Sequence, residues 1–528
     1  MKIFKIARKM HNRNIVRLLF ILLFYSEACA QNIEWEVSLG GSGDDLNNFT
    51  CQTLDSGFLV VGYTSSNDGD VVGFHPGNCT STNCYDMWVV KLNKFGIIEW
   101  SKSLGGSMID IGRCAALSGS GYLIAGSSSS NDGDVSGNHG GSDAWIVKLD
   151  SSGGILWQKC IGGIDNDLFQ SIIGLPDHSI IAFGSTFSND SWVQGNHGGQ
   201  DFWLVKMDSA ANIIWQSCYG GGGEELSFSM KQTSDQGFIL CGFTNSTDGQ
   251  PSIPFGRDRQ YWLLKTDSMG SMLWNNNYGG SLDDWCTDVV ETNDGGFMLT
   301  GLALSTNYDV TNRHDVLMDD GWVVKTDNVG NIVWQHAMGG TLQDEFYSII
   351  RKEDSSYVTS GFTISNDDDV SGNHSTREDV WLVQFSEQGI IESQKCFGGP
   401  YSDESQKIIQ TFDNGFALSC NTYGPGFDVS SFHGGHTDFW VLKLGPIITS
   451  IKESDKNNIR LFPIPAHEYI SFENLILPQR VSIFSISGKK LKDFSVKANN
   501  DRLNISDLST GVYILKTTDG RVQKIVKY

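Results

Sequence analysis

Short runs of apolar residues, each ended by a polar turn, recur along most of this chain at a nearly constant interval. The most regular run contains a tryptophan, and successive copies of it lie 57 to 60 residues apart. These seven tryptophans are Trp88, Trp145, Trp203, Trp262, Trp322, Trp381 and Trp440. A Gly-Gly pair recurs with the same period and begins at Gly40, Gly105, Gly162, Gly220, Gly279, Gly339 and Gly398. A fixed period in this range indicates an array of equivalent supersecondary units.

Each unit reads as four short β-strands. In the second unit, the runs CAALSGS, GYLIAGSS, AWIVKLD and ILWQKCIGG are separated by residues typical of turns. The runs are apolar with little alternation, which predicts strands that are buried on both faces. Sheets repeated radially bury both faces and leave only short edges. We therefore predict an all-β chain in which residues 31–445 form a seven-bladed β-propeller of four-stranded blades.

The phase of the repeat predicts how the ring closes. The repeat starts with a lone fourth strand, IEWEVSLGG at residues 33–41, and ends with a third strand at residues 438–444. The last blade therefore lacks one strand, and the N-terminal segment has one to spare. We expect residues 33–39 to pair with residues 438–444 and to complete the seventh blade.

The N-terminus has the features of a secretory signal. Six basic residues precede a short apolar segment, and the small-x-small sequence Ala28-Cys29-Ala30 precedes Gln31. These features predict a signal peptide over residues 1–30. The apolar segment is too short to span a bilayer, and no other segment approaches the roughly 18 apolar residues of a membrane helix. The mature chain is expected to have no transmembrane span.

The tail abandons the repeat. Residues 446–458 form a polar linker, and residues 459–528 contain several short strands, which predict a small β-sandwich. The segments LFPIPA, VSIFSISGKKL, LNISDLSTGVYILK and KIVKY resemble, in order and spacing, the C-terminal sorting domain of the type IX secretion system of Bacteroidetes. Ile464 departs from the family, which usually has Asn between the two prolines. The positions that carry the resemblance are Pro463, Pro465, Gly488, Lys489, Gly511 and Tyr513.

This resemblance implies a partner and a destination. The partner would be the type IX secretion machinery, which exports proteins across the outer membrane after they have reached the periplasm. The resemblance also implies removal of the tail, followed by release of the protein or its attachment at the cell surface.

The balance of charge narrows the choice of partners. The chain has 61 acidic residues against 38 Lys and Arg, a formal net charge of −23, and both of its ends are basic. The propeller region is therefore strongly acidic. Such a surface argues against nucleic acid, which is bound by neutralising phosphates with cations. It suits cations, basic partners or simple solubility.

Cysteines permit one clear pairing. An exported protein can form disulfides, and Cys79 and Cys84 lie together in an insertion that lengthens a loop of the first blade. We predict a disulfide between them. The other cysteines of the mature chain lie within strand runs and are expected to be buried free thiols, with a bridge between Cys160 and Cys218 of successive blades as the alternative.

Acidic residues recur in two sets of loops that a propeller places on one face. One set follows each Gly-Gly pair and comprises Asp45, Asp110, Asp167, Glu225, Asp284, Asp344 and Asp403. We expect these carboxylates to ring the entry to the innermost strands. The other set lies in Asp-rich loops, chiefly Asp68, Asp70, Asp132, Asp134, Asp367 and Asp369. Three interpretations remain open: turn formation, calcium binding by closely spaced oxygens, and catalysis by paired carboxylates, which recurrence in all blades disfavours.

Other candidate positions are repeated histidines and two tryptophans outside the repeat. Five loop histidines recur, at His75, His139, His197, His374 and His433, but equivalent loops point outward around a ring and disfavour a shared zinc site. Trp192 and Trp285 are candidate ligand-binding residues, because an unusual aromatic in a polar loop can stack on a sugar or anchor a partner. Local packing is the alternative for both.

The sequence contains no familiar catalytic motif. It has no G-x-S-x-G, H-E-x-x-H or P-loop pattern. The sequence therefore predicts an exported, cell-surface or secreted propeller that binds or adheres to a glycan or a protein. The alternative is a secreted propeller enzyme that acts on polysaccharide, as a glycosidase or a lyase.

Overall fold

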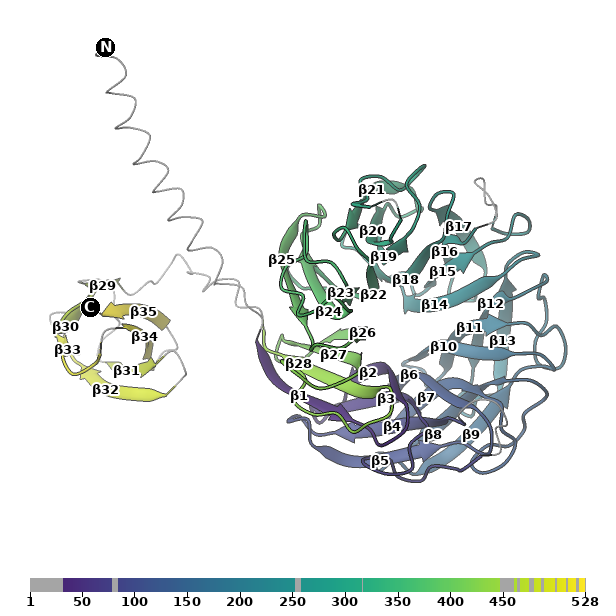
Figure 1. Cartoon of the computed structure of the whole chain (residues 1–528), viewed down its shortest axis with the longest axis horizontal. Coiled ribbons are helices and arrows are strands. Elements are labelled where there is room, and N and C mark those ends of the chain that lie inside the picture. The colour runs from purple at the N-terminus through teal and green to yellow at the C-terminus, as the bar shows by residue number, and fades with distance from the viewer. Residues whose placement is uncertain are drawn as a thin grey trace, which may run out of the picture. The chain divides into compact units, whose positions relative to one another are not determined.

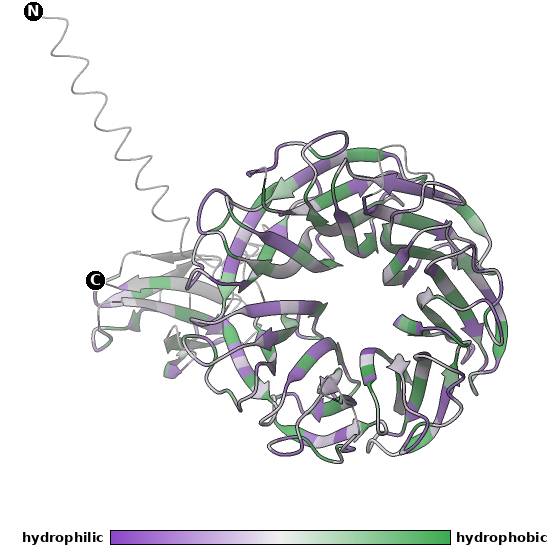
Figure 2. Ribbon diagram, turned by 45° about the vertical axis from the view of Figure 1, so that its right-hand side comes forward, coloured by the Kyte–Doolittle hydropathy of each residue, from purple (hydrophilic) through white to green (hydrophobic). Residues whose placement is uncertain are grey.

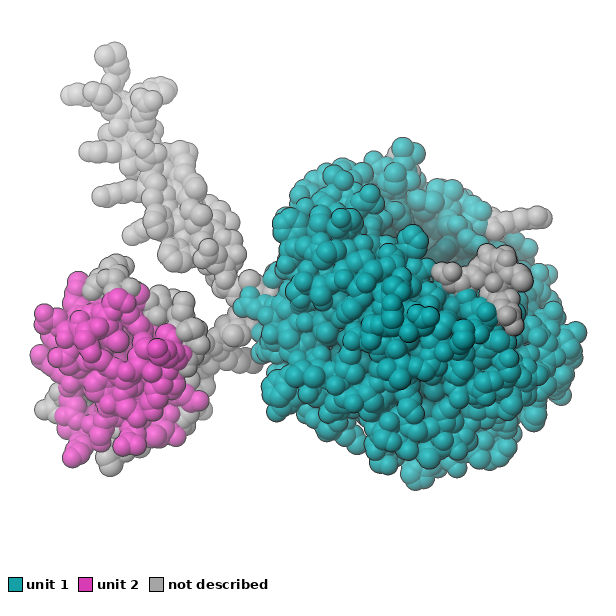
Figure 3. Space-filling view, turned by 60° about the horizontal axis from the view of Figure 1, so that its bottom comes forward, with its two compact units in different colours: residues 1–447 teal, residues 448–528 magenta. Residues whose placement is uncertain are grey.

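A computed structural model describes the propeller at residues 32–77, 84–251, 258–315 and 317–446, and the tail at residues 460–462, 466–473, 479–485, 489–498, 501–509, 511–518 and 522–527. The chain divides into two compact units, residues 1–447 and 448–528 (Figure 3). The predicted signal peptide and nearly all of the predicted linker lie outside the described residues.

The first unit contains 28 strands. The N-terminal strand is β1 (Ile33–Leu39), and the others follow in groups: β2 (Asp45–Gln52), β3 (Phe58–Thr64), β4 (Asp86–Leu92) and β5 (Ile98–Leu104); β6 (Asp110–Ser118), β7 (Gly121–Ser128), β8 (Asp143–Leu149) and β9 (Ile155–Ile161); β10 (Asp167–Gly174), β11 (Ile180–Thr186), β12 (Asp201–Met207) and β13 (Ile213–Tyr219); β14 (Glu225–Gln232), β15 (Phe238–Thr244), β16 (Gln260–Thr266) and β17 (Met272–Tyr278); β18 (Asp284–Glu291), β19 (Phe297–Ala303), β20 (Asp320–Thr326) and β21 (Ile332–Met338); β22 (Asp344–Arg351), β23 (Tyr357–Thr363), β24 (Asp379–Phe385) and β25 (Ile391–Phe397); and β26 (Asp403–Gln410), β27 (Phe416–Thr422) and β28 (Asp438–Leu444).

These strands form seven four-stranded antiparallel sheets arranged around one axis (Figure 1). In each sheet the first strand of the group lies nearest the axis, and in six sheets the last strand of the group lies at the periphery. The described residues contain no α-helix. The predicted all-β fold, a seven-bladed β-propeller, is confirmed.

The seventh sheet draws its outermost strand from the N-terminus. Strand β1 pairs antiparallel with β28, with Leu39 opposite Phe439 and Ile33 opposite Leu444. The order within this sheet is β1-β28-β27-β26. Residues from the two ends of the repeat are therefore hydrogen-bonded neighbours.

The repeated tryptophan of each third strand is the centre of its blade. All seven rings are fully buried, and in six blades the indole Nε1 donates to a side chain 13 residues further on, as Trp88 does to Ser101 at 2.9 Å. In the seventh blade this partner is Glu36 of β1, at 2.9 Å from Trp440. Apolar segments recur in every blade (Figure 2). Tryptophan therefore fills the sheet-to-sheet core while its one polar atom ties the third strand to the fourth.

Glycine in the second strand of six blades has a steric cause. A Cβ on Gly62 would lie 2.0 Å from the carbonyl oxygen of Leu46 on the innermost strand, and a Cβ on Gly184 would lie 1.7 Å from that of Leu168. The innermost strands are bulged at this point. The bulge presses a carbonyl against the second strand, so that only glycine fits without a shift.

The second unit is a small all-β fold. Its strands are β29 (Arg460–Phe462), β30 (Tyr469–Glu473), β31 (Gln479–Ser485), β32 (Lys490–Val496), β33 (Leu503–Asn504), β34 (Gly511–Thr517) and β35 (Val522–Lys527). They form two sheets, with the orders β29-β30-β33 and β32-β31-β34-β35.

Half of the predicted sorting-motif residues can be placed in this unit. Lys489 precedes β32, Gly511 begins β34, and Tyr513 is buried with its hydroxyl donating to the Ser509 carbonyl at 2.6 Å. Pro463, Pro465 and Gly488 lie outside the described residues.

Candidate functional site

A β-bulge occurs at the same place in the innermost strand of every blade. In β2, for example, the register shifts between Asn47 and Phe49, which leaves Asn48 unpaired. All seven unpaired residues line a single cavity at the propeller axis: Asn48, Arg113, Gln170, Phe228, Thr287, Tyr347 and Gln406. Bulges re-aim side chains in this way and are frequent beside active sites.

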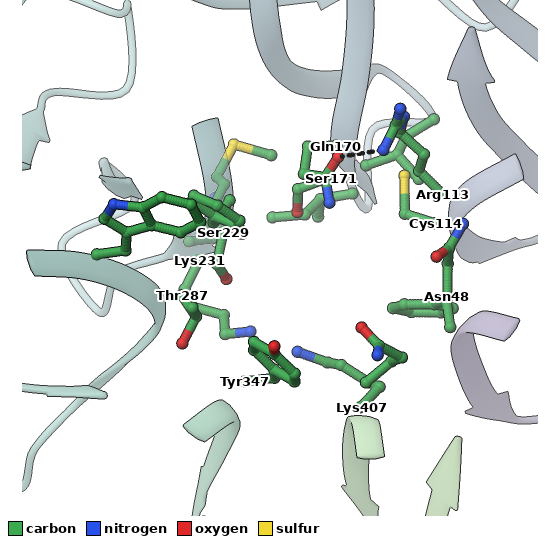
Figure 4. A pocket seen from close by; sticks show the side chains of 18 of the residues that line it. Asn48, Arg113, Cys114, Gln170, Ser171, Ser229, Lys231, Thr287, Tyr347 and Lys407 are labelled. Carbon is green, nitrogen blue, oxygen red and sulfur yellow. Dashed lines mark hydrogen bonds between the residues drawn. The ribbon is translucent and has the colours of Figure 1, made fainter. Parts of the chain in front are cut away.

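The cavity has a volume of about 590 Å³ and opens to solvent (Figure 4). This lies within the range of about 300–1,000 Å³ that is typical of small-molecule sites. Its lining combines apolar side chains, among them Phe49, Ile172 and Met230, with amide, hydroxyl and charged groups. This cavity at the propeller axis, called the channel below, is therefore the candidate ligand site.

Two lysines in the cavity share one buried carboxylate. Lys231 of β14 lies 3.1 Å from Asp288 Oδ1, and Lys407 of β26 lies 2.8 Å from Asp288 Oδ2. Ser229 and Ser348 also donate to Asp288, at 2.6 and 2.9 Å. Burial opposes ionisation of this carboxyl, but the two ammonium groups and the hydroxyls hold its pKa far below the ordinary value. Asp288 is thus a fixed anion that positions both amines.

The same carboxylate affects the two lysines differently. Burial acts to lower the pKa of both ammonium groups. For Lys231 the attraction of Asp288 outweighs burial and the pKa is raised, whereas for Lys407 burial prevails, helped by repulsion from Lys231, and the pKa is lowered.

Arg113 adds a third cation from β6. Its Nη1 lies 3.4 Å from Oε1 of Gln170, the bulged residue of the next blade. Its Nε is buried and has no hydrogen-bond partner among the described residues. A guanidinium with an unused donor beside a cavity is suited to donate to a ligand oxygen.

Carboxyl groups with raised pKa values lie where the strands of two blades begin. Burial and the neighbouring Asp319 raise the pKa of Glu345, the second residue of β22, to about 8. Tyr347 and Gln343 each donate to this carboxyl at 2.7 Å. Burial, with Glu378, raises the pKa of Glu404, the equivalent residue of β26, to about 7. Glu345 is therefore mostly protonated at neutral pH.

The two tryptophans outside the repeat have different environments. Trp285, the second residue of β18, lines the cavity, and the Arg259 guanidinium lies 5.3 Å from its ring centre. Trp192 lies away from the channel, with its Nε1 donating to His139 Nε2 at 3.0 Å and the Lys159 amine 5.4 Å from its ring. The structure does not bring them together, and their ligand-binding roles stay predictions.

The acids after the Gly-Gly pairs ring the entry to the innermost strands, as the sequence predicts, because each is the first residue of such a strand. All seven side chains are buried. Asp45 Oδ2 accepts from the Gly41 amide and from Ser66 Oγ, both at 2.8 Å, and Thr64 donates to Oδ1. These carboxylates do not face solvent, and that of Asp45 ties its loop to the end of the second strand.

Carboxylates of the Asp-rich loops also accept backbone hydrogen bonds. Asp68 Oδ1 accepts from the Ser42 amide at 2.7 Å, and Asp70 Oδ2 accepts from the Gly40 amide at 3.3 Å. Equivalent bonds are made by Asp132, Asp134, Asp367 and Asp369. No group of three or more potential metal ligands among His, Cys, Asp and Glu occurs in the described part of the chain. Calcium binding at these loops stays a prediction.

Histidines lie between a buried aspartate of their own blade and the loop of the next blade. His433 Nδ1 lies 2.9 Å from Asp438 Oδ2, and its Nε2 lies 3.5 Å from Asp70 of the first blade. The other loop histidines pair in the same way with the first residue of their third strand. His314, which was not singled out from the sequence, does so too.

Cysteines divide into two groups. Cys84 is disulfide-bonded. Its predicted partner, Cys79, lies outside the described residues, so that pairing stays a prediction. The remaining described cysteines, Cys160 and Cys218 among them, are free thiols. The alternative bridge between these two blades is therefore wrong.

The buried carboxyl groups predict a propeller that is more stable in mild acid than at neutral pH. Burial is the main cause that raises the pKa of Asp45, Asp86, Asp284, Asp344 and Asp438 to about 6, against about 3.9 in an unfolded chain. The folded state therefore binds protons more tightly, and the stability this provides is fully present below about pH 4 and is lost as the pH rises through about 6. We expect melts at constant ionic strength to show a melting temperature several degrees higher at about pH 5 than at about pH 8.

Carboxyl groups with lowered pKa values change the stability of the propeller in the opposite direction, but only at lower pH. Asp55, Asp235 and Asp294 have pKa values of about 2, because hydrogen bonds and a lysine outweigh burial. The stability they provide is present above about pH 4 and is lost below it. A melting temperature that is equal or lower at about pH 5 than at about pH 8 would contradict the prediction.

Comparison with known proteins bears on the tail and on the fold. Residues 460–528 match the family model of the secretion system C-terminal sorting domain. Among curated proteins, none matches this chain significantly. Solved structures that resemble it are the Pan2 WD40 domain of Neurospora crassa (7% identity, 79% of this chain and 96% of that chain, TM-score 0.43) and Sqt1 of Chaetomium thermophilum (8%, 79% and 100%, TM-score 0.41). A third is a protein of unknown function from Bacteroides caccae (11%, 59% and 90%, TM-score 0.34).

The match of the tail confirms the resemblance to a type IX sorting domain. A domain of this kind indicates handling by the type IX secretion machinery and export, followed by secretion or attachment at the cell surface. Within the described residues, no helix is long and apolar enough to cross a membrane. The chain thus consists of a seven-bladed β-propeller followed by a type IX C-terminal sorting domain.

Proposed function

We propose that this protein is an exported binding propeller that takes its ligand in the central channel. A signal peptide over residues 1–30 brings it to the periplasm, and the type IX machinery exports it and removes the tail. The mature propeller then acts in the medium or on the cell surface, where a glycan or a protein segment is the ligand.

One observation carries this proposal. Around the ring, the tryptophans, the Gly-Gly pairs and the buried acids repeat almost unchanged, but the bulged residues differ: Asn48, Arg113, Gln170, Phe228, Thr287, Tyr347 and Gln406. A structural role would favour the same residue in every blade. Different side chains that converge on one cavity are instead suited to an asymmetric ligand.

The second candidate function is a polysaccharide-degrading enzyme, which one observation favours. Glu345, whose pKa is about 8, holds a proton at neutral pH and is hydrogen-bonded to Tyr347 in the channel lining. A carboxyl group of this kind can act as a general acid. Cleavage of a glycan in the channel would require it.

A glycan array probed with the mature chain, followed by assays for new reducing ends and unsaturated products, tests both functions. We expect binding without turnover, and we expect the double variant Gln170→Ala/Thr287→Ala to weaken it. The matched control is Leu273→Ala, which removes an exposed side chain on the outermost strand of its blade, outside the channel. Products that form with the wild type but not with Glu345→Gln would favour the enzyme. Binding that the double variant leaves unchanged would refute the channel as the site.

A further inference from the structure

The charge inside the channel is opposite to that of the molecule. The chain carries a formal charge of −23, yet the cavity is lined by Arg113, Lys231 and Lys407, against the single acid Glu345. Burial holds the pKa of Glu345 near 8, so this acid is mostly neutral at neutral pH. The negative charge of Asp288 balances the positive charge of one of the two ammonium groups. The interior therefore has an excess of positive charge, which an anionic ligand would neutralise.

The two amines, and not their shared carboxylate, face the cavity. The side chain of Asp288 is 1% exposed, whereas those of Lys231 and Lys407 are 35% and 18% exposed. Figure 4 shows the side chains of the two lysines ending close together at one side of the cavity. Each ammonium group has three donors, of which Asp288 engages one. The remaining donors are placed to hold an oxygen anion between the two nitrogens.

The rest of the lining also offers hydrogen-bond partners for hydroxyl groups. Asn48, Gln170 and Gln406 present side-chain amides, and Tyr347 presents a hydroxyl. Amides both donate and accept, as sugar hydroxyls do. Trp285 contributes an aromatic surface of the type on which sugar rings stack.

We propose that the channel binds an anionic saccharide, with a uronate carboxylate held between Lys231 and Lys407 and with Arg113 and the amides binding the neighbouring oxygens. This inference rests on the proposed function and adds the chemical class of the ligand. A free oligosaccharide and the end of a polysaccharide chain share this chemistry. Both are therefore included in the test.

Calorimetry with matched probes on the mature chain tests the charge requirement. Trigalacturonate and maltotriose have the same number of rings and differ in their carboxylates, while sodium sulfate tests the ion alone. We expect trigalacturonate to bind at least about tenfold more tightly than maltotriose, and its affinity to fall as salt screens the charges. Polygalacturonate shows whether a chain end is also accepted.

Substitutions at Lys407 test whether the preference for a charged oligosaccharide arises in the channel. Lys407→Gln should weaken the binding of trigalacturonate about tenfold or more. Lys407→Arg, which keeps the positive charge, should retain most of the affinity. Lys159→Gln removes a lysine outside the channel and is the matched control. Thermal melts of all three variants show whether they are folded.

Several outcomes would overturn the inference. These are equal affinity for maltotriose, no binding of either oligosaccharide, binding of sulfate as tight as that of trigalacturonate, or an unchanged affinity of a folded Lys407→Gln variant. The proposed function is judged separately. Binding of a neutral glycan that is weakened by Gln170→Ala/Thr287→Ala would keep the channel as the site while refuting its preference for anions.

Discussion

Deleting residues 32–39 is expected to lower the melting temperature of the propeller by roughly 10 °C or more, because the seventh blade loses its outermost strand. Leu39 is buried at this junction, and the loss of one such side chain costs about 1.5–3 kcal/mol. The deletion also removes the bonds from Trp440 to Glu36 and from Lys443 to Glu34, at 2.9 and 3.1 Å. Each kcal/mol corresponds to about 2–4 °C in a domain of moderate size.

The deletion should also open the ring. Trp35 of β1 packs on Phe58 of the first blade, with ring centres 5.5 Å apart, and donates to the Lys94 carbonyl at 3.1 Å. Strand β1 therefore joins the last blade to the first. Differential scanning calorimetry measures the change, with Glu34→Gln as a mild control at the partly exposed edge. A synthetic peptide of residues 32–41 should restore part of the lost stability. An unchanged melting temperature would contradict the closure.

Removing residues 459–528 is expected to abolish export in a host with a type IX secretion system. The sorting domain occupies this segment, and without it the propeller has no signal for the outer-membrane step. The folded protein should then accumulate in the periplasm, since the predicted signal peptide is still present. Quantitative immunoblots of medium, cell surface and periplasm measure the distribution.

A transfer experiment separates loss of the signal from loss of folding. Residues 446–528 fused behind an unrelated periplasmic carrier should carry it out of the cell, while the carrier alone stays inside. The truncated propeller should keep its melting transition, since the tail is a separate compact unit. Equal amounts of truncated and intact protein outside the cell would refute the prediction.

The fold could be predicted from the sequence because its signals are repeated. Each tryptophan marks a third strand, and each Gly-Gly pair marks the loop between blades. A strand whose sequence is ambiguous in one blade can therefore be assigned from the equivalent strands of the other six.

The burial of the acids could not be predicted from the acids alone. Their partners follow another repeat, Thr64 and Ser66 in the first blade and Thr186 and Ser188 in the third, at the end of the second strand.

The channel was missed for a geometric reason. Its lining residues lie about one repeat apart in the sequence and meet only when the ring closes. A bulge also breaks the alternation of side chains along a strand, and hydrophobic pattern does not reveal it. One signal was present: the third residue after each repeated acid, Arg113 in the second unit and Tyr347 in the sixth, varies in chemistry where its surroundings hardly vary.

The bulges have a consequence for how this molecule could change. An unpaired residue such as Gln170 or Gln406 contributes no ladder hydrogen bond to the repeat, so its identity can vary at little cost in stability. Seven such positions line one cavity, and they can be substituted in many combinations on the same scaffold. New specificities would then arise by single substitutions, through natural drift or in a designed library, while the architecture that presents them stays the same.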